Sequence, residues 1–176
     1  MSITVDTTAP AAPTFTTTDT TTNDTPPIII GTAEAGSTVE LFNGDTSLGA
    51  TTAAGTSGIF SITPSSELSE GLNSLTVTAT DAINNVSAAS GVLSITVDTT
   101  APDQPAITTT TALTSDATPT IEGTAEAGST VTLFVDVENT GITTTADGTT
   151  GSYTIAPSSS LPDGTHNLSV TATDKL

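Results

Sequence analysis

The sequence predicts an all-β protein made of two tandem antiparallel β-sandwich domains, arranged end to end. Three observations support this prediction. Long segments recur at a spacing of about 92 residues, short alternating apolar and polar runs are separated by turn residues, and no helical period of useful length is present. Threonine, a β-branched residue that favours strands, accounts for 44 of the 176 residues.

The repeat is visible in several nearly identical segments. They are SITVDTTAP at 2–10 and 94–102, GTAEAGSTV at 31–39 and 123–131, and VTATD at 77–81 and 170–174. The offset changes from 92 to 93 along the chain, so one residue is inserted between strands. A period of this length suits one small domain and is too long for a solenoid repeat.

The repeat also sets the predicted domain boundaries. Residues 1–9 correspond to the end of a preceding repeat and its linker, and residues 10–98 to the first sandwich. Residues 99–101 form a linker, and residues 102–176 form the second sandwich. This second sandwich is expected to lack its last strand, because Asp174 falls where a seventh strand begins.

The strand pattern points to a particular sandwich architecture. Seven strands are predicted in the first domain, at 13–18, 27–33, 38–43, 47–53, 58–63, 72–80 and 90–97. Seven short strands with turns every 8–12 residues are typical of an immunoglobulin-like sandwich. Paired cysteines around a tryptophan are absent, so the likeness is to the architecture only. An odd number of strands places the termini at opposite ends, which suits a string of domains.

Composition excludes several classes of function. With 19 Asp or Glu against one Lys or Arg, the net charge of −18 repels nucleic acid and anionic membrane surfaces. The absence of cysteine removes disulfides, thiolate metal sites and thiol nucleophiles. The only histidine, His166, takes the place of Asn73 in the repeat and is interpreted as a surface substitution. The longest apolar run is Ile28–Ile30. We therefore expect no enzyme, no nucleic-acid partner and no membrane insertion.

The acidity itself has three interpretations. Disordered chains combine high net charge with low hydropathy, but only 11% of these residues are charged and the mean hydropathy is slightly positive. Adaptation to a saline medium would also deplete lysine. The third interpretation is that the carboxylates bind cations, and their positions favour it.

The first acidic trio is Asp6, Glu34 and Asp81. These residues come from separate segments that the strand count places at one end of the first domain. Two carboxylates about 4 Å apart repel by about 4 kcal/mol at an effective dielectric constant of roughly 20. The chain offers almost no basic residues, so a cation from solvent is expected. Oxygen ligands without His or Cys select Ca²⁺ or, less well, Mg²⁺. The second acidic trio is Asp98, Glu126 and Asp174. The alternative is that all six carboxylates are simply solvated.

The repeat as a whole resembles a known family. VDTTAP, GTAEAGSTV followed by LF, a PSS turn and VTATD are similar to the bacterial immunoglobulin-like (Big) tandem repeats of giant surface adhesins and biofilm-associated proteins. The resemblance implies export by type I secretion, an extracellular place on the bacterial cell surface, and Ca²⁺ that rigidifies the array. The resemblance also implies that the six acidic residues of the two trios are the ion ligands. This chain has Asn84 where the family usually has Gly, and Asn84 is expected to adopt the same left-handed turn.

Two functions from different classes follow. The first is a structural spacer in an adhesin involved in cell adhesion and biofilm formation, with neighbouring repeats as its partners. The alternative is a module that itself binds a glycan or receptor. Residues 2–6 also resemble the last strand of a repeat, which suggests head-to-tail self-association through the unpaired edge of the second domain.

Overall fold

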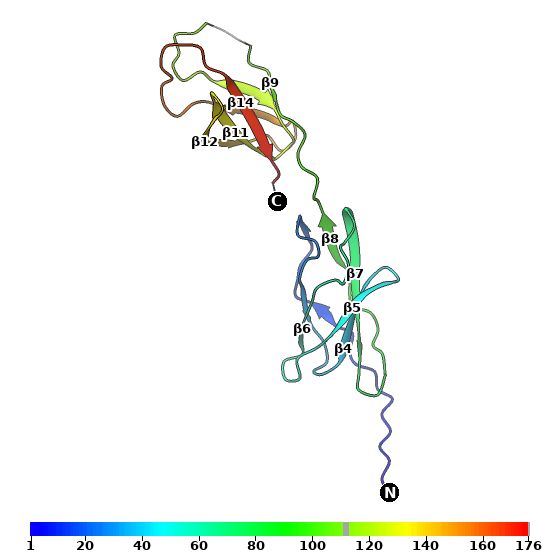
Figure 1. Cartoon of the computed structure of the whole chain (residues 1–176). Helices are drawn as coiled ribbons and strands as arrows, with labels where there is room; N and C mark the ends of the chain where they lie inside the picture. The colour runs from blue at the N-terminus through cyan, green and yellow to red at the C-terminus, as the bar shows by residue number, and fades with distance from the viewer. Residues whose placement is uncertain (111–112, 176) are drawn as a thin grey trace. The chain divides into compact units, whose positions relative to one another are not determined.

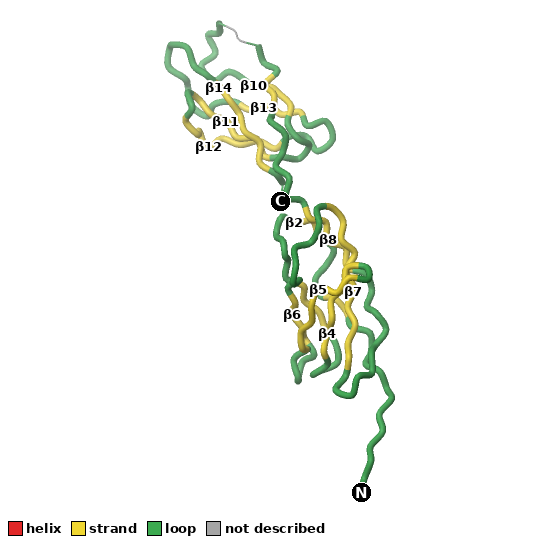
Figure 2. Tube along the Cα trace, turned by 45° about the vertical axis from the view of Figure 1, so that its right-hand side comes forward, coloured by secondary structure: helices red, strands yellow, loops and turns green. Residues whose placement is uncertain are grey.

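The computed structural model describes residues 1–110 and 113–175 and divides into two compact units, Met1–Thr99 and Thr100–Leu176. Every regular element among the described residues is a β-strand (Figure 1), and the strands of each unit form two sheets (Figure 2). The predicted all-β class with two tandem sandwiches is therefore confirmed.

The first unit contains eight strands, in a three-stranded sheet of order β1-β3-β6 and a five-stranded sheet of order β2-β8-β7-β4-β5. The strands are β1 (Thr14–Phe15), β2 (Thr20–Thr22), β3 (Ile29–Thr32), β4 (Thr38–Asn43), β5 (Thr46–Thr52), β6 (Ile59–Ile62), β7 (Gly71–Thr80) and β8 (Leu93–Val97).

The core of the first unit lies between these two sheets. Successive side chains of a strand point to opposite faces, and β7 shows this clearly, because Leu75, Val77 and Ala79 are buried while the threonines between them are half-exposed. From the three-stranded sheet, Ile29 and Phe60 join the same apolar cluster. Alternation of apolar and polar residues along the sequence is thus what builds the sandwich.

Phe60 packs over a glycine of the neighbouring strand. Gly31 of β3 pairs with Phe60 of β6, and a Cβ at Gly31 would collide with the Phe60 ring and with the carbonyl oxygen of Thr14. Gly123 and Tyr153 repeat this arrangement in the second unit, where the Tyr153 hydroxyl donates to the Ala106 carbonyl at 2.9 Å. Only glycine leaves room for the ring at this position.

The first predicted strand, 13–18, is wrong in its extent. The chain leaves one sheet after β1 because the amides of Thr16 and Thr17 both donate to the Ile30 carbonyl, at 2.8 and 3.0 Å. It then joins the other sheet as β2, which pairs with β8 in parallel, and the Asp19 carboxylate accepts the Ser94 amide at 2.7 Å. The sandwich is therefore antiparallel except at this one pair of strands in the described structure.

The second unit has the same plan with fewer strands among its described residues. Its sheets have the orders β13-β10-β9 and β12-β11-β14. The strands are β9 (Ala106–Ile107), β10 (Ile121–Thr124), β11 (Thr130–Val135), β12 (Glu138–Thr145), β13 (Ser152–Ile155) and β14 (Leu168–Thr173). Its buried cluster contains Ile121, Val131, Leu133, Tyr153 and Ile155.

Candidate functional site

The loop that follows β7 is held by one carboxylate. Asp81 Oδ1 accepts the backbone amides of Ile83 at 2.9 Å and Asn85 at 2.8 Å, and its Oδ2 accepts the Asn85 side-chain amide at 2.8 Å. Asn84 has a φ of 70°, so it adopts the left-handed turn expected from the sequence. The loop thus fixes the Asp81 carboxylate in one orientation.

These hydrogen bonds also keep the carboxylate ionised. Desolvation raises the pKa of Asp81, but the hydrogen bonds from the Asn85 side chain and from the amides of Asn85, Ile83 and Asn84 together outweigh it, and the pKa lies below 3.8. The loop therefore presents a negatively charged oxygen pair at neutral pH.

The other two segments of the first acidic trio lie beside this loop. The Asn85 side-chain amide also donates to the Asp6 carbonyl, at 3.4 Å. Thr38 pairs with Thr80, and Glu34 precedes Thr38 by four residues, in a turn closed by the Ser37 amide and hydroxyl on the Glu34 carbonyl. Asp6 and Glu34 are exposed, and the Asp6 carboxylate accepts the amide of Thr8.

The three segments meet, but their carboxylates do not gather around a common point. Within residues 1–110 and 113–175, no group of three acidic or histidine side chains is placed to hold a metal ion. The chemistry of the donors suits Ca²⁺, since the Asp81 carboxylate and the Asp6 carbonyl are both hard oxygen ligands. The fit is therefore partial, because the side chains of Asp6 and Glu34 would have to turn toward Asp81.

The second acidic trio is divided between the two units. Asp98 follows β8 in the first unit, and its amide donates to the Thr22 carbonyl at 3.0 Å. Glu126 and Asp174 belong to the second unit, where the Glu126 carbonyl accepts the Ser129 amide and the Asp174 carboxylate accepts the Lys175 amide. Convergence of these three carboxylates remains a prediction.

His166 makes specific contacts that the sequence interpretation missed. Its ring lies half-buried, with Nδ1 2.7 Å from Asp136 Oδ2 and Nε2 2.9 Å from the Pro162 carbonyl oxygen. Its counterpart Asn73 is buried in the first unit, so the two positions differ in exposure. Alignment of the repeats at an offset of 93, which pairs Asn43 with Asp136 and Asn73 with His166, is the signal that points to this contact.

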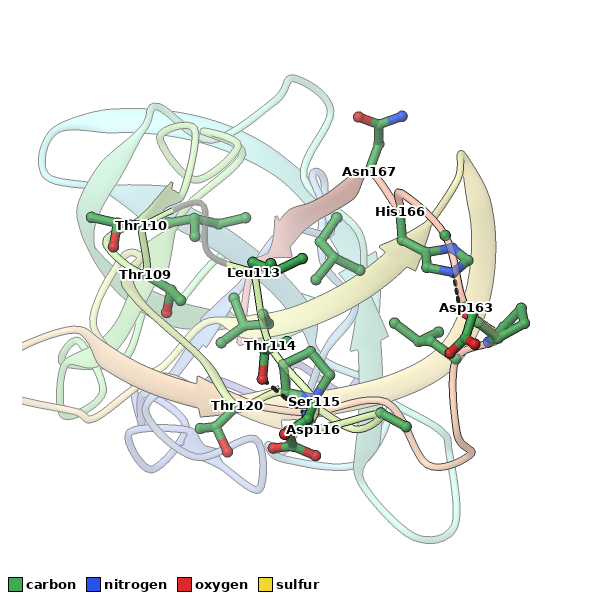
Figure 3. Close-up of a pocket in the computed structure, with 18 residues that line it drawn as sticks. Thr109, Thr110, Leu113, Thr114, Ser115, Asp116, Thr120, Asp163, His166 and Asn167 are labelled. Atoms are coloured by element: carbon green, nitrogen blue, oxygen red, sulfur yellow. Dashed lines mark hydrogen bonds between the residues drawn. The ribbon is translucent and has the colours of Figure 1, made fainter.

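The second unit also contains an open cavity of about 870 Å³ (Figure 3). Leu113, His166 and Asn167 lie around the cavity in the close-up, and apolar residues from β9, β10 and the start of β14 also line it. Its described apolar lining is Ile107, Leu113, Ile121, Leu161 and Leu168.

The fold and its repeats define a pair of tandem immunoglobulin-like β-sandwiches. The sequence profile of the bacterial Ig-like domain matches residues 2–99 and 101–176, so the chain belongs to that family. No curated protein sequence matches the chain. In the described residues, no helix has the length and hydropathy needed to cross a membrane.

Two solved structures are similar to the chain. One is the BSP domain of a biofilm-associated protein, with 21% identity and a TM-score of 0.34 over 94% of this chain and 27% of that one. The other is described as a Ca²⁺-stabilized adhesin that helps an Antarctic bacterium reach out and bind ice, with 22% identity and a TM-score of 0.38. That match covers 83% of this chain and 42% of the adhesin chain, so the present chain spans less than half of either protein.

Proposed function

We propose that the chain is a pair of spacer repeats from a large bacterial surface adhesin, exported by type I secretion and acting in cell adhesion and biofilm formation. The observation that carries this proposal is the direct succession of two copies of one family domain. β8 ends at Val97, and the second unit begins at Thr100. A protein built from such units is lengthened by adding further repeats, and a single repeat needs no catalytic or ligand-binding site to serve as a spacer.

The identical segments 2–10 and 94–102 support this role. Each segment precedes one sandwich, and residues 94–97 also lie within the last strand of the first sandwich. The same sequence therefore ends one domain and leads into the next, as a continuous array requires. The immediate partners of each repeat would be its neighbours in the same protein.

A replacement experiment tests the spacer role. In a bacterium that displays the parent protein, residues 10–176 are exchanged for two unrelated β-sandwich domains of matched length. A spacer tolerates the exchange, so adhesion of the cells is retained, whereas deletion of the same residues without replacement weakens it. Loss of adhesion after the exchange would instead show that these repeats bind the target themselves.

We further propose that Ca²⁺ binds the acidic loops and stiffens the array. The ligands would be Asp6, Glu34 and Asp81 in the first trio and Asp98, Glu126 and Asp174 in the second. The ionised carboxylate of Asp81 and its link through Asn85 to Asp6 are the contacts that support this. A bound Ca²⁺ would neutralise the repelling carboxylates and join segments that are distant in sequence.

Calorimetric titration with Ca²⁺ tests this second proposal. Extracellular modules bind Ca²⁺ with dissociation constants of about 10⁻⁴–10⁻³ M, and a similar value is expected here. Asp81→Asn should weaken binding, while Glu67→Gln, which removes the charge of an exposed residue outside both trios, should not. Thermal melting in EDTA, in Ca²⁺ and in NaCl of equal ionic strength completes the test. If NaCl stabilises as well as Ca²⁺, calcium binding is refuted and the spacer role stands.

A binding module remains the second candidate, and the cavity of the second unit is the observation that favours it. Sugar-binding clefts usually offer stacking aromatics, yet the chain has no Trp and its one Tyr is buried. Saturable binding of the purified chain on a glycan array would support this candidate against the spacer.

A further inference from the structure

The chain that leaves β8 is held from both sides of the sheet. β8 lies between β2 and β7 in the five-stranded sheet. On the β2 side, the amide of Asp98, the first residue after β8, donates to the Thr22 carbonyl at 3.0 Å. On the β7 side, the next residue, Thr99, is bound by the side chain of Glu70, which immediately precedes β7. Two successive residues are therefore anchored to segments on opposite sides of β8.

Both hydrogen-bond donors of Thr99 meet the same carboxylate. The Thr99 hydroxyl donates to Glu70 Oε2 at 2.8 Å, and the Thr99 amide is shared between Oε2 at 3.2 Å and Oε1 at 3.3 Å. Hydrogen bonds to a carboxylate are stronger than those between neutral groups. Because the carboxylate binds the main chain and the side chain of Thr99 together, it fixes the orientation of this residue as well as its position.

The segment that carries Glu70 is itself fixed. Asn73 is 2% exposed and donates from Nδ2 to the carbonyls of Ser69 at 2.7 Å and Gly71 at 3.0 Å. These two residues flank Glu70 in the sequence. Leu68, 5% exposed, anchors the same segment in the apolar core. The Glu70 side chain therefore extends from an ordered backbone, which lowers the entropy cost of holding an exposed contact.

The residues that follow Thr99 are constrained by their own sequence. Pro102 has a fixed φ and restricts Ala101 to extended conformations. With Asp98 and Thr99 anchored as well, few backbone dihedral angles between β8 and Pro102 can turn freely. All of these constraints come from groups of the protein, so they act with or without a bound cation.

We propose that Glu70 is a positioning residue that fixes the direction in which the chain leaves the first sandwich. It thereby gives an array of such repeats a stiffness that does not depend on Ca²⁺. The usefulness of this stiffness rests on the spacer role proposed above, because a flexible junction shortens the mean reach of a chain of domains. The contact itself rests on the hydrogen bonds of Glu70 and Thr99 alone.

Amide hydrogen exchange of Thr99, measured by NMR in EDTA, gives the first test. Glu70→Gln leaves one carbonyl oxygen where the carboxylate offers two, so exchange at Thr99 should become about tenfold faster. Glu67→Gln removes the same charge from an exposed residue of the same connection between β6 and β7, and it should leave the rate unchanged.

Variants of Thr99 separate the contact from the charge of Glu70. Thr99→Val keeps the carboxylate but removes the hydroxyl, so it should also lower the protection of the amide, corrected for the intrinsic rate of each residue. Thr99→Ser retains the hydroxyl and should keep the protection. If exchange is faster only in Glu70→Gln, the lost charge accounts for it, and the proposal is overturned. Unchanged protection in both Glu70→Gln and Thr99→Val overturns it as well.

Pulsed electron paramagnetic resonance gives the second test, because the natural chain contains no cysteine. Thr56→Cys and Thr149→Cys place one spin label at an exposed position of each unit. In EDTA, Glu70→Gln should broaden the distribution of distances between the labels, and Glu67→Gln should leave the distribution as it is in the labelled parent.

Urea denaturation of the same proteins distinguishes positioning from a merely structural role. If Glu70→Gln lowers stability but leaves the width of the distance distribution unchanged, Glu70 does not position the linker and the proposal is overturned. Equal widths with equal stability overturn it too. Neither result touches the spacer role, because the domain-exchange experiment described above does not depend on Glu70.

Discussion

His166 lies 2.7 Å from Asp136 and so reproduces, in the second unit, the contact that Asn73 makes with Asn43 at 2.9 Å in the first. Each residue also forms a hydrogen bond with the carbonyl oxygen of the residue four positions before it, which is Pro162 for His166 and Ser69 for Asn73. A neutral amide pair and an ionisable pair thus perform the same structural task, and only the second depends on pH.

The pKa of His166 is expected to lie above 6.5. The hydrogen bond to Asp136 and then that to the Pro162 carbonyl raise it, because two acceptors are both satisfied only by the doubly protonated ring. His166 therefore contributes stability fully below pH 6.5, and the contribution is lost as pH rises through the raised folded pKa. As the only histidine, it is followed directly by proton NMR titration.

The partner carboxylate has the opposite dependence. Hydrogen bonds from the Asn167 amide and from His166 lower the pKa of Asp136 below 3.8, so its contribution is present above that pH and is lost as pH falls through the lowered value. Asp136→Asn should return the His166 pKa toward 6.5, whereas Asp163→Asn should leave it higher. An unchanged pKa in Asp136→Asn would contradict the ion pair.

Gly31→Ala should destabilise the first unit by about 1–3 kcal/mol through overpacking against Phe60 and Thr14. Gly55→Ala is the matched control, since a Cβ there meets nothing within 4 Å. Tyrosine fluorescence reports only the second unit, because Tyr153 is the only tyrosine and the chain has no tryptophan. The urea midpoint should therefore fall when unfolding is followed by circular dichroism, and should not change when it is followed by tyrosine fluorescence.

Asn73→Ala should cost about 1–3 kcal/mol, because it leaves the Asn43 amide and the Ser69 and Gly71 carbonyls without their buried partner. The same denaturation experiment measures the loss. Asn23→Ala, at an exposed position, should change stability by less than about 0.5 kcal/mol. Equal effects of the two substitutions would argue against a structural role for the Asn73 contacts.

Asn85→Ala should raise the pKa of Asp81 toward 3.8, since one of the hydrogen bonds to the carboxylate is lost while desolvation still opposes ionisation. The Asp81 contribution to stability would then be smaller, and its loss during acidification below pH 3.8 would be complete at a higher pH. Carbon-detected NMR titration of the Asp81 carboxyl group measures the shift. The backbone amides of Ile83 and Asn85 should remain bonded to it.

Much of the fold follows from the sequence, because apolar alternation decides which face of each strand is buried. The predicted strand at 38–43 agrees with β4, and those at 47–53 and 72–80 agree with β5 and β7 within a residue at each end. The division of the first predicted strand into β1 and β2 does not follow from the sequence pattern. It depends on Thr16 and Thr17 sharing the Ile30 carbonyl, a tertiary contact that leaves no local pattern in a threonine-rich segment.

The site was predictable in part. The strand count located the loops that bear Glu34 and Asp81 at one end of the first unit, as the pairing of Thr38 with Thr80 requires. It gave no information on where the carboxylates point. The central role of Asn85 depends on the direction of one side chain, which repeat spacing does not determine.

The parallel pairing of β2 with β8 has a mechanical consequence. These strands come early and late in the sequence of the first unit, and Thr20 to Thr22 run beside Ile95 to Val97 in the same direction. A pull on the chain before β2 and after β8 draws the paired strands along one another in opposite directions. All of their hydrogen bonds then bear shear together and cannot open one at a time from an end. The unit should therefore resist extension most strongly at the pair of strands that interrupts its antiparallel pattern.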